Sequence, residues 1–230
     1  MHRINKWSYQ EHDLIGIISK VYNVSKDQLS KIHLHRKDLY LDDPVRKSDG
    51  TTDWIDEAST KFHKQFYNFM NSDRSSNFYQ WYKNFIYNDV SPWFSESFVY
   101  QKSPSFRIHL PDLQAISKWH FDSDDDHRHP LWEINFHVAV TDIFETNSVW
   151  IETIPGLKDF TPVEMKKGHY TIFDGNRCTH GNKLNTTGNT RISFDFRVMP
   201  ISRYNKISPL VSATTNKKFI IGEYYDLFTK

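Results

Sequence analysis

The chain has 230 residues, a formal net charge of +1 and a single cysteine, Cys178. This length suits one large domain with some elaboration and disfavours two independent domains of full size. Because acids and bases are interspersed and nearly balanced, no broad basic face is expected, and a nucleic acid partner is not expected. One cysteine excludes an intramolecular disulfide framework and fits a reducing compartment. With no signal-peptide pattern and no apolar run of membrane-spanning length, we expect a cytoplasmic protein without a membrane segment.

The first 97 residues are predicted to form a helical region. Apolar residues recur there at helical spacing, and the first two stretches follow a capping-box pattern of serine with glutamate or glutamine three residues later. These stretches predict helices over about 9–22, after Ser25, from Asp53 to Met70 and from Phe78 to Pro92. Turn signals over 41–50 predict an exposed connection between the second and third helices.

From residue 98 onward the pattern changes to short extended segments separated by turn residues. Candidate strands lie at the His120 segment and at 106–110, 132–140, 149–151, 163–165, 170–173 and 191–198. Dense strands without intervening helices predict a sandwich or barrel and disfavour a parallel α/β sheet. The whole chain is therefore predicted to be an α+β fold, with the helical region 1–97 packed on a core of 98–200. The apolar segment 201–230 is expected to dock on that core.

A His-x-Asp pair, His120 and Asp122, precedes a second histidine, His180. In an extended segment residues i and i+2 point to the same side, so His120 and Asp122 can face one site. Two imidazoles and one carboxylate leave other coordination positions open, which is the arrangement that non-heme Fe(II) oxygenases use. Since the chain has 12 histidines, a His-x-Asp pair alone is a weak signal. Its context on predicted β elements strengthens it.

Arg191 and Ser193 lie two residues apart at the start of the last long predicted strand. A guanidinium can bind a buried carboxylate through two parallel hydrogen bonds, and a hydroxyl on the same face can add a third. Together with a metal, this pair describes a site for a 2-oxo dicarboxylate. We therefore predict His120, Asp122 and His180 as catalytic metal ligands, with Arg191 and Ser193 as cosubstrate ligands.

These motifs resemble those of the Fe(II)/2-oxoglutarate-dependent dioxygenases. More narrowly, several segments look like the branch typified by a streptomycin-biosynthesis oxygenase, namely 119–122, 133–136, 152–156, 173–182 and 190–198. The resemblance covers about 98–200 and implies a double-stranded β-helix, or jelly-roll, core with iron at one open end. It implies Fe(II) as cofactor, 2-oxoglutarate and O2 as cosubstrates, and release of succinate and CO2. It also implies oxidation of a second substrate, most often by hydroxylation, without naming that substrate.

Several other residues could contact the cosubstrate or substrate. In this reading Asn135 could donate to the proximal carboxylate of 2-oxoglutarate, or it could equally satisfy a neighbouring turn. Arg107 and Arg197 are borne on strands and need anionic partners if they face the interior. Either could bind a substrate carboxylate, and Arg197 could instead pair with Glu152. Arg107, Glu152 and Arg197 are thus the candidate substrate residues. The charged run 124–129 is better explained as a solvated loop than as a second metal site.

The sequence thus predicts an oxidoreductase that hydroxylates a small polar metabolite such as an amino acid, a sugar or an aminocyclitol. One rival is a family member that acts on a macromolecule. Another is a non-enzymatic jelly roll that only binds a ligand. In the last case Arg191 and Ser193 would be dispensable, whereas an oxygenase needs Arg191 to bind 2-oxoglutarate.

Overall fold

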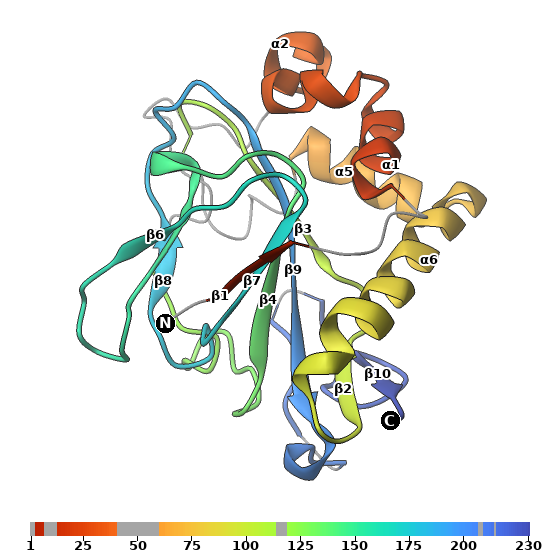
Figure 1. Ribbon diagram of the computed structural model, residues 1–230, viewed down its shortest axis with the longest axis vertical. Helices are drawn as coiled ribbons and strands as arrows, with labels where there is room; N and C mark the ends of the chain where they lie inside the picture. Colours follow the sequence, from red (N-terminus) through yellow and green to blue (C-terminus); the bar gives the residue numbers. More distant parts are fainter. Residues whose placement is uncertain (1–2, 7–12, 41–59, 114–118, 207–208, 214) are drawn as a thin grey trace.

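The computed structural model describes residues 3–6, 13–40, 60–113, 119–206, 209–213 and 215–230. Three layers are visible in Figure 1, where α1, α5 and α6 lie on one side of β4 and β9 and the smaller sheet with β6 and β8 lies on the other. The helical elements are α1 (Leu14–Tyr22), η1 (Lys26–Lys31), α2 (Ile32–His35), α3 (Lys37–Tyr40), α5 (Lys61–Met70), η2 (Asp73–Ser75), α6 (Ser76–Phe85), the π-helix η3 (Ile86–Val90), η4 (Ser91–Trp93), η5 (Glu145–Asn147) and η6 (Ile201–Arg203). No helix in these ranges combines the length and apolar character that a membrane crossing needs.

The helices begin where local capping favours them. Asp13 caps α1, since its side chain accepts a hydrogen bond from the N–H of Gly16. The predicted capping box after Ser25 is confirmed, and Gln28 Oε1 accepts from the Ser25 N–H at 2.9 Å. The turn that follows is a 3₁₀-helix and not an α-helix. The predicted cap before residue 13 and the predicted segments over 41–59 lie outside the described residues.

The main sheet has seven strands in the order β1-β7-β4-β9-β2-β10, with β3 also paired to β9. Its strands are β1 (Arg3–Lys6), β2 (Phe98–Gln101), β3 (Ser105–His109), β4 (Ile134–Ala139), β7 (His169–Phe173), β9 (Arg191–Pro200) and β10 (Tyr225–Phe228). The smaller sheet has the order β6-β5-β8, with β5 (Val149–Ile151), β6 (Thr161–Val163) and β8 (His180–Asn182). All pairings within these sheets are antiparallel.

Three strand predictions need correction. Region 1–97 is not helical throughout, because it contains β1, which pairs with β7 at the edge of the main sheet. No local sequence pattern predicts this pairing. The strand expected at 163–165 lies instead at Thr161–Val163, and Met165 forms only an isolated bridge with Ile143. The His120 segment is likewise no strand, since it forms a single bridge with His180.

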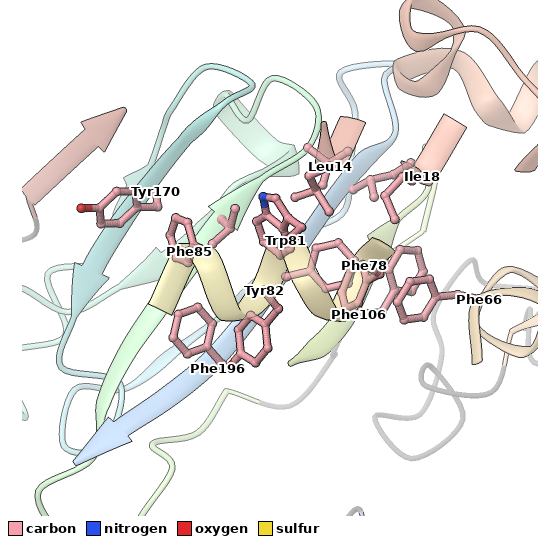
Figure 2. Close-up of a cluster of buried hydrophobic side chains, with 14 of the residues drawn as sticks. Leu14, Ile18, Phe66, Phe78, Trp81, Tyr82, Phe85, Phe106, Tyr170 and Phe196 are labelled. Carbon is pink, nitrogen blue, oxygen red and sulfur yellow. The ribbon is translucent and has the colours of Figure 1, made fainter. Parts of the chain in front are cut away.

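The two faces of the main sheet differ in chemistry because successive side chains on a strand point to opposite sides. On β9, Phe194 and Phe196 face the helices. Phe194 lies 5.4 Å from Phe66 and 5.2 Å from Phe78, measured between ring centroids. Figure 2 shows this aromatic cluster, in which Phe196 meets Tyr82 and Phe85 of α6. The helices therefore bury the apolar face of the sheet and leave its polar face to form a site.

The carboxyl-terminal segment packs against the other end of the main sheet. Its strand β10 pairs with β2, and the fully buried Tyr225 joins Phe219 and Met199 in a separate apolar cluster.

Candidate metal centre

His120, Asp122 and His180 converge at the edge of the smaller sheet. The backbone N–H of His120 donates to the carbonyl of His180 at 3.0 Å, and the reverse bond is 2.8 Å long. This bridge places the two imidazoles side by side, with ring centroids 4.5 Å apart. Their Nε2 atoms lie 3.7 and 3.8 Å from Asp122 Oδ1. All three side chains are buried, and one ligand atom from each lies within 4.8 Å of the others. Two imidazole nitrogens and a carboxylate oxygen at this separation suit one divalent cation.

The environment of His180 favours the form that binds a metal. Its Nδ1 lies 3.1 Å from the carbonyl oxygen of Cys178. A proton on Nδ1 would donate to that carbonyl, which leaves the Nε2 lone pair directed into the site. Burial, and next the neighbouring His120, lower the pKa of His180 to about 4. The imidazole is therefore neutral near pH 7 without having to lose a proton when a metal binds.

The Asp122 carboxylate is held ionised and in a fixed orientation. Arg197 donates from Nε to Oδ2 and from Nη2 to Oδ1, each at 3.1 Å, and Asn135 Nδ2 donates to Oδ2 at 2.7 Å. Burial alone would raise the pKa of Asp122, but the charge of Arg197 and the neighbouring His120 imidazole hold it well below its usual value. The backbone N–H of Asp122 donates to the carbonyl of Gly175 at 2.8 Å, which fixes its position in the chain.

A small polar cavity of about 40 Å³ adjoins the triad on the side of Arg191. The guanidinium of Arg191 is buried, and its Nη1 donates to the carbonyl of Asn147 and to Asn182 Oδ1, each at 2.8 Å. Among the described residues that line the cavity, Asn135 Oδ1 and His137 Nε2 are buried without a hydrogen-bond partner, and so is Ser193 Oγ, two residues from Arg191 on the same strand. Leaving such atoms unpaired costs about 1–3 kcal/mol each, so a polar ligand or water is expected there.

The chain can be placed among known proteins by its sequence. It is 32% identical over 170 residues to the streptomycin biosynthesis protein StrG of Streptomyces griseus, and the alignment spans 74% of this chain and 77% of that protein. The chain belongs to the StrG family. A scan against protein-family models finds no match.

Solved structures of other proteins overlap this StrG-family chain in part. AviO1 from Streptomyces viridochromogenes has a TM-score of 0.44 and 13% identity, over 89% of this chain and 91% of that one. ThoJ, a non-heme monooxygenase solved with nickel, has a TM-score of 0.40 and 17% identity, over 52% and 54%. CytC3 with Fe(II) and α-ketoglutarate has a TM-score of 0.34 and 21% identity, over 44% of each chain. These scores are low, so the chemistry of the site is inferred from its own side chains.

The candidate site contains an ion-pair network that links Asp122 of the triad to the two arginines singled out from the sequence. Asp195 accepts from Arg107 Nε at 2.6 Å and Nη2 at 3.3 Å, and from Arg197 Nη1 at 2.9 Å. Arg197 in turn holds Asp122, so the network runs from Arg107 to the triad. Burial would raise the pKa of Asp195, but Arg107 and Arg197 lower it to about 2.

Glu152 does not pair with Arg197, as one reading of the sequence suggested. Its carboxylate accepts instead from the backbone N–H groups of Thr179, Gly156 and Lys158, at 2.8, 3.2 and 3.0 Å. Glu152 therefore supports the segment that leads into His180. Asn135 also has a contact other than the one expected, because its amide nitrogen donates to Asp122.

The charged run after the His-x-Asp pair is a turn, as expected. Asp124 Oδ1 accepts from the N–H groups of Asp126 and His127 and lies 2.7 Å from His127 Nδ1. The His127 ring stacks on His120, with centroids 4.0 Å apart. The only three-ligand cluster of His, Cys, Asp or Glu among the described residues is the triad itself.

Two features of the site were missed in the sequence. Asp195 follows Arg191 and Ser193 at strand spacing, so alternation on β9 could have identified it. Gly175 has no such signal. A Cβ atom there would lie 2.8 Å from Asn135 Nδ2, so only glycine allows Asn135 its position beside Asp122.

Proposed function

We propose that this StrG-family chain is an Fe(II)- and 2-oxoglutarate-dependent oxygenase that oxidises a small polar metabolite, most simply by hydroxylation. The observation that carries this proposal is the convergence of two imidazoles and one carboxylate beside a buried arginine and unpaired buried polar atoms. Bound Fe(II) with 2-oxoglutarate and O2 supplies oxidative decarboxylation to succinate and CO2 together with oxidation of a substrate C–H bond. The partner is then a small molecule, with neither nucleic acid nor membrane required.

The arrangement of the sheets supports a double-stranded β-helix core for this enzyme. Two antiparallel sheets face each other, and the His120 bridge adds a fourth segment beside β8 of the smaller one. The polar face of β9 and β4 is turned toward the triad, and the aromatic face is turned toward α5 and α6. In this proposal 98–200 is the catalytic core, with the regions 1–97 and 201–230 packed on it as parts of one domain.

The chain's own residues have separate tasks in this proposal. His120, Asp122 and His180 hold the metal, and Arg197 and Asn135 keep Asp122 ionised and oriented. Arg191 and Ser193 bind the distal carboxylate of 2-oxoglutarate, as a guanidinium and a hydroxyl suit it. The 40 Å³ cavity is smaller than this five-carbon dicarboxylate. Side chains that line the cavity must therefore move apart when it binds.

The test is anaerobic addition of Fe(II) and then 2-oxoglutarate to the apoprotein. We expect the visible charge-transfer band of an iron-chelated 2-oxo acid. His180→Ala should abolish the band by weakening metal binding. Arg191→Ala should keep metal binding but raise the 2-oxoglutarate concentration that gives half of the band by at least about tenfold, since a charge-assisted hydrogen bond contributes roughly 1.5–3 kcal/mol.

Matched controls separate these effects from general damage. His169→Ala and Arg203→Ala remove the same residue types from outside the site, and both should retain the wild-type band. A folded wild-type protein that binds metal without producing the band would contradict the proposal. In that case the non-enzymatic ligand-binding jelly roll becomes the better account.

A further inference from the structure

A second and larger cleft shares Arg107, His120 and Arg197 with the small cavity and is also lined by Asp122. Its volume is about 400 Å³, which lies in the range of small-molecule sites. His120, Asp122, Arg107 and Arg197 line it close to the metal position. Farther out it is lined by side chains that are aromatic or polar, among them Tyr67, Tyr79, Gln101, Ser103, Ser105 and Lys217. A substrate bound here would lie against the metal ligands without entering the cavity beside Arg191.

The charges that line this cleft are unevenly distributed. Among the described lining residues, Asp122 is the only acid, whereas Arg107, Arg197 and Lys217 are cations. Asp195 does not line the cleft, and its carboxylate accepts hydrogen bonds from both arginines. Two further acids are nearby, Asp124 and Glu133, but their carboxylates point at His127 and His129, which separate them from the cleft.

The net charge around the metal position can be counted when Fe(II) and 2-oxoglutarate are included. This count rests on the proposed function. Asp122 and the two carboxylates of 2-oxoglutarate carry three negative charges, which a divalent metal and Arg191 neutralise. Arg107 and Arg197 then share the single charge of Asp195, which leaves one positive charge without a counterion beside the metal. A buried or half-buried charge without a partner is unfavourable, so a bound anion is favoured.

Arg107 is the member of the network that can meet a ligand. The side chain of Arg197 is only 8% exposed and is bound to both Asp122 and Asp195. The side chain of Arg107 is 26% exposed and bonds Asp195 through Nε and Nη2. Its Nη1 bonds no other described residue and can therefore meet a ligand, with Asp195 holding the guanidinium in a fixed orientation.

From this juxtaposition we propose that the substrate carries an anionic group, a carboxylate or a phosphate ester, that binds Arg107 and places the rest of the molecule against the metal. The tyrosines, serines and Gln101 of the outer wall suit a hydroxyl-bearing body. Lys217 at the rim adds attraction for the same anion.

The experiment uses matched probes with the anaerobic Fe(II)–2-oxoglutarate complex of the wild-type protein. Glucose, glucose 6-phosphate, glucuronate and glucosamine present one pyranose frame with no charge, a phosphate, a carboxylate and an ammonium group. Each is titrated while the shift of the visible band is followed. We expect at least one of the two anionic probes to bind about tenfold or more tightly than glucose, and glucosamine to bind no better than glucose. The phosphate and carboxylate arms identify which anion is preferred.

Two variants assign the preference to Arg107. Arg107→Gln should remove it, and Arg107→Lys, which keeps a charge beside Asp195, should retain part of it. Equal binding of charged and neutral probes to the wild type would overturn the proposal, as would a preference that survives Arg107→Gln. An anion that abolishes the band has displaced 2-oxoglutarate and also counts against it. If the wild type shows no band before any probe is added, the proposed function fails instead. The wild-type comparison stands even where a variant does not fold.

Discussion

The properties of a single carboxylate govern the metal site. Asp122 accepts three hydrogen bonds from Arg197 and Asn135, and both donors come from the sheet that also carries Arg191. Such supporting contacts fix the direction of a metal ligand and keep it ionised. In the proposed metal site Asn135 would therefore act through Asp122, and the other role expected from the sequence, a bond to the cosubstrate, would compete with this contact.

Asn135→Ala separates these two roles. If Asn135 positions Asp122, the variant should bind metal roughly ten- to a hundredfold more weakly, the usual cost of losing a supporting contact. Calorimetric titration with Mn²⁺ measures this directly. Asn77→Ala, an exposed asparagine on α6, is the control. An unchanged metal affinity with weakened 2-oxoglutarate binding would favour the role first expected.

The sequence predicts the role of a site residue only where the residues that act with it are close in sequence. The His-x-Asp pair and Arg191 with Ser193 follow strand periodicity, so they could be found without a structure. The partner of Arg197 could not be found in this way. The sequence left two possible partners for Arg197, a substrate carboxylate and Glu152. The structure shows that Arg197 pairs with Asp122 and Asp195, and its contact with Asp122 depends on the packing of segments that are distant in sequence.

Among the elements, β9 contributes to both the core and the site. Arg191, Ser193, Asp195 and Arg197 alternate with Ile192, Phe194 and Phe196 along one strand, and all seven side chains are buried. Periodicity predicted this strand well. It could not predict that β1 would pair with β7, or that the His120 segment would form only one bridge, because such pairings depend on backbone contacts with distant strands.

Substitutions on the aromatic face of β9 should affect stability. Phe194 is fully buried against Phe66, Phe78 and Trp81. Phe194→Ala should lower the free energy of unfolding by about 3–5 kcal/mol, as deletion of a buried phenyl ring typically does. Urea denaturation of the apoprotein measures the loss. A change below about 1 kcal/mol would show that the helices do not depend on this face.

A substitution on the polar face of β9 should affect cosubstrate binding and leave stability nearly unchanged. Ser193 Oγ is buried without a hydrogen-bond partner in the described part of the chain. Ser193→Ala should therefore leave apoprotein stability unchanged or slightly higher, since an unpaired hydroxyl is removed. The same variant should weaken 2-oxoglutarate binding in the band titration. A marked loss of stability would contradict this assignment, and so would unchanged cosubstrate affinity.

For the whole molecule, buried histidines set the response to acid. Burial, with Arg107 next in effect, lowers the pKa of His63 to about 3, and burial with Arg191 does the same for His109. The unfolded chain takes up these protons near the ordinary value of 6.5, whereas the folded chain does not. Below pH 6.5 the unfolded state therefore binds more protons, and stability falls as the pH is lowered. Asp195, with its pKa lowered to about 2, adds a further loss only in stronger acid.

His63→Leu tests this response away from the metal site. Each such histidine contributes a slope of about 1.4 kcal/mol per pH unit below the unfolded pKa. The variant should lose one such slope between pH 6 and pH 4 when unfolding free energy is measured by urea denaturation. Phe78→Leu changes a buried side chain that does not titrate, so it should shift the curve without changing its slope. An unchanged slope in His63→Leu would show that other groups govern acid unfolding.

Because β9 contributes one face to the apolar core and the other to the candidate site, an error in its strand register would affect both. A one-residue slip in the pairing of a strand exchanges its two faces. In β9 such a slip would press Arg191, Asp195 and Arg197 against the rings of α5 and α6 and expose Phe194 and Phe196 to the polar cavity. A molecule with that error loses its core and its site together. Packing of the hydrophobic interior therefore also fixes the register of the candidate site, and a stably folded molecule carries Arg191, Asp195 and Arg197 on the face turned toward the triad.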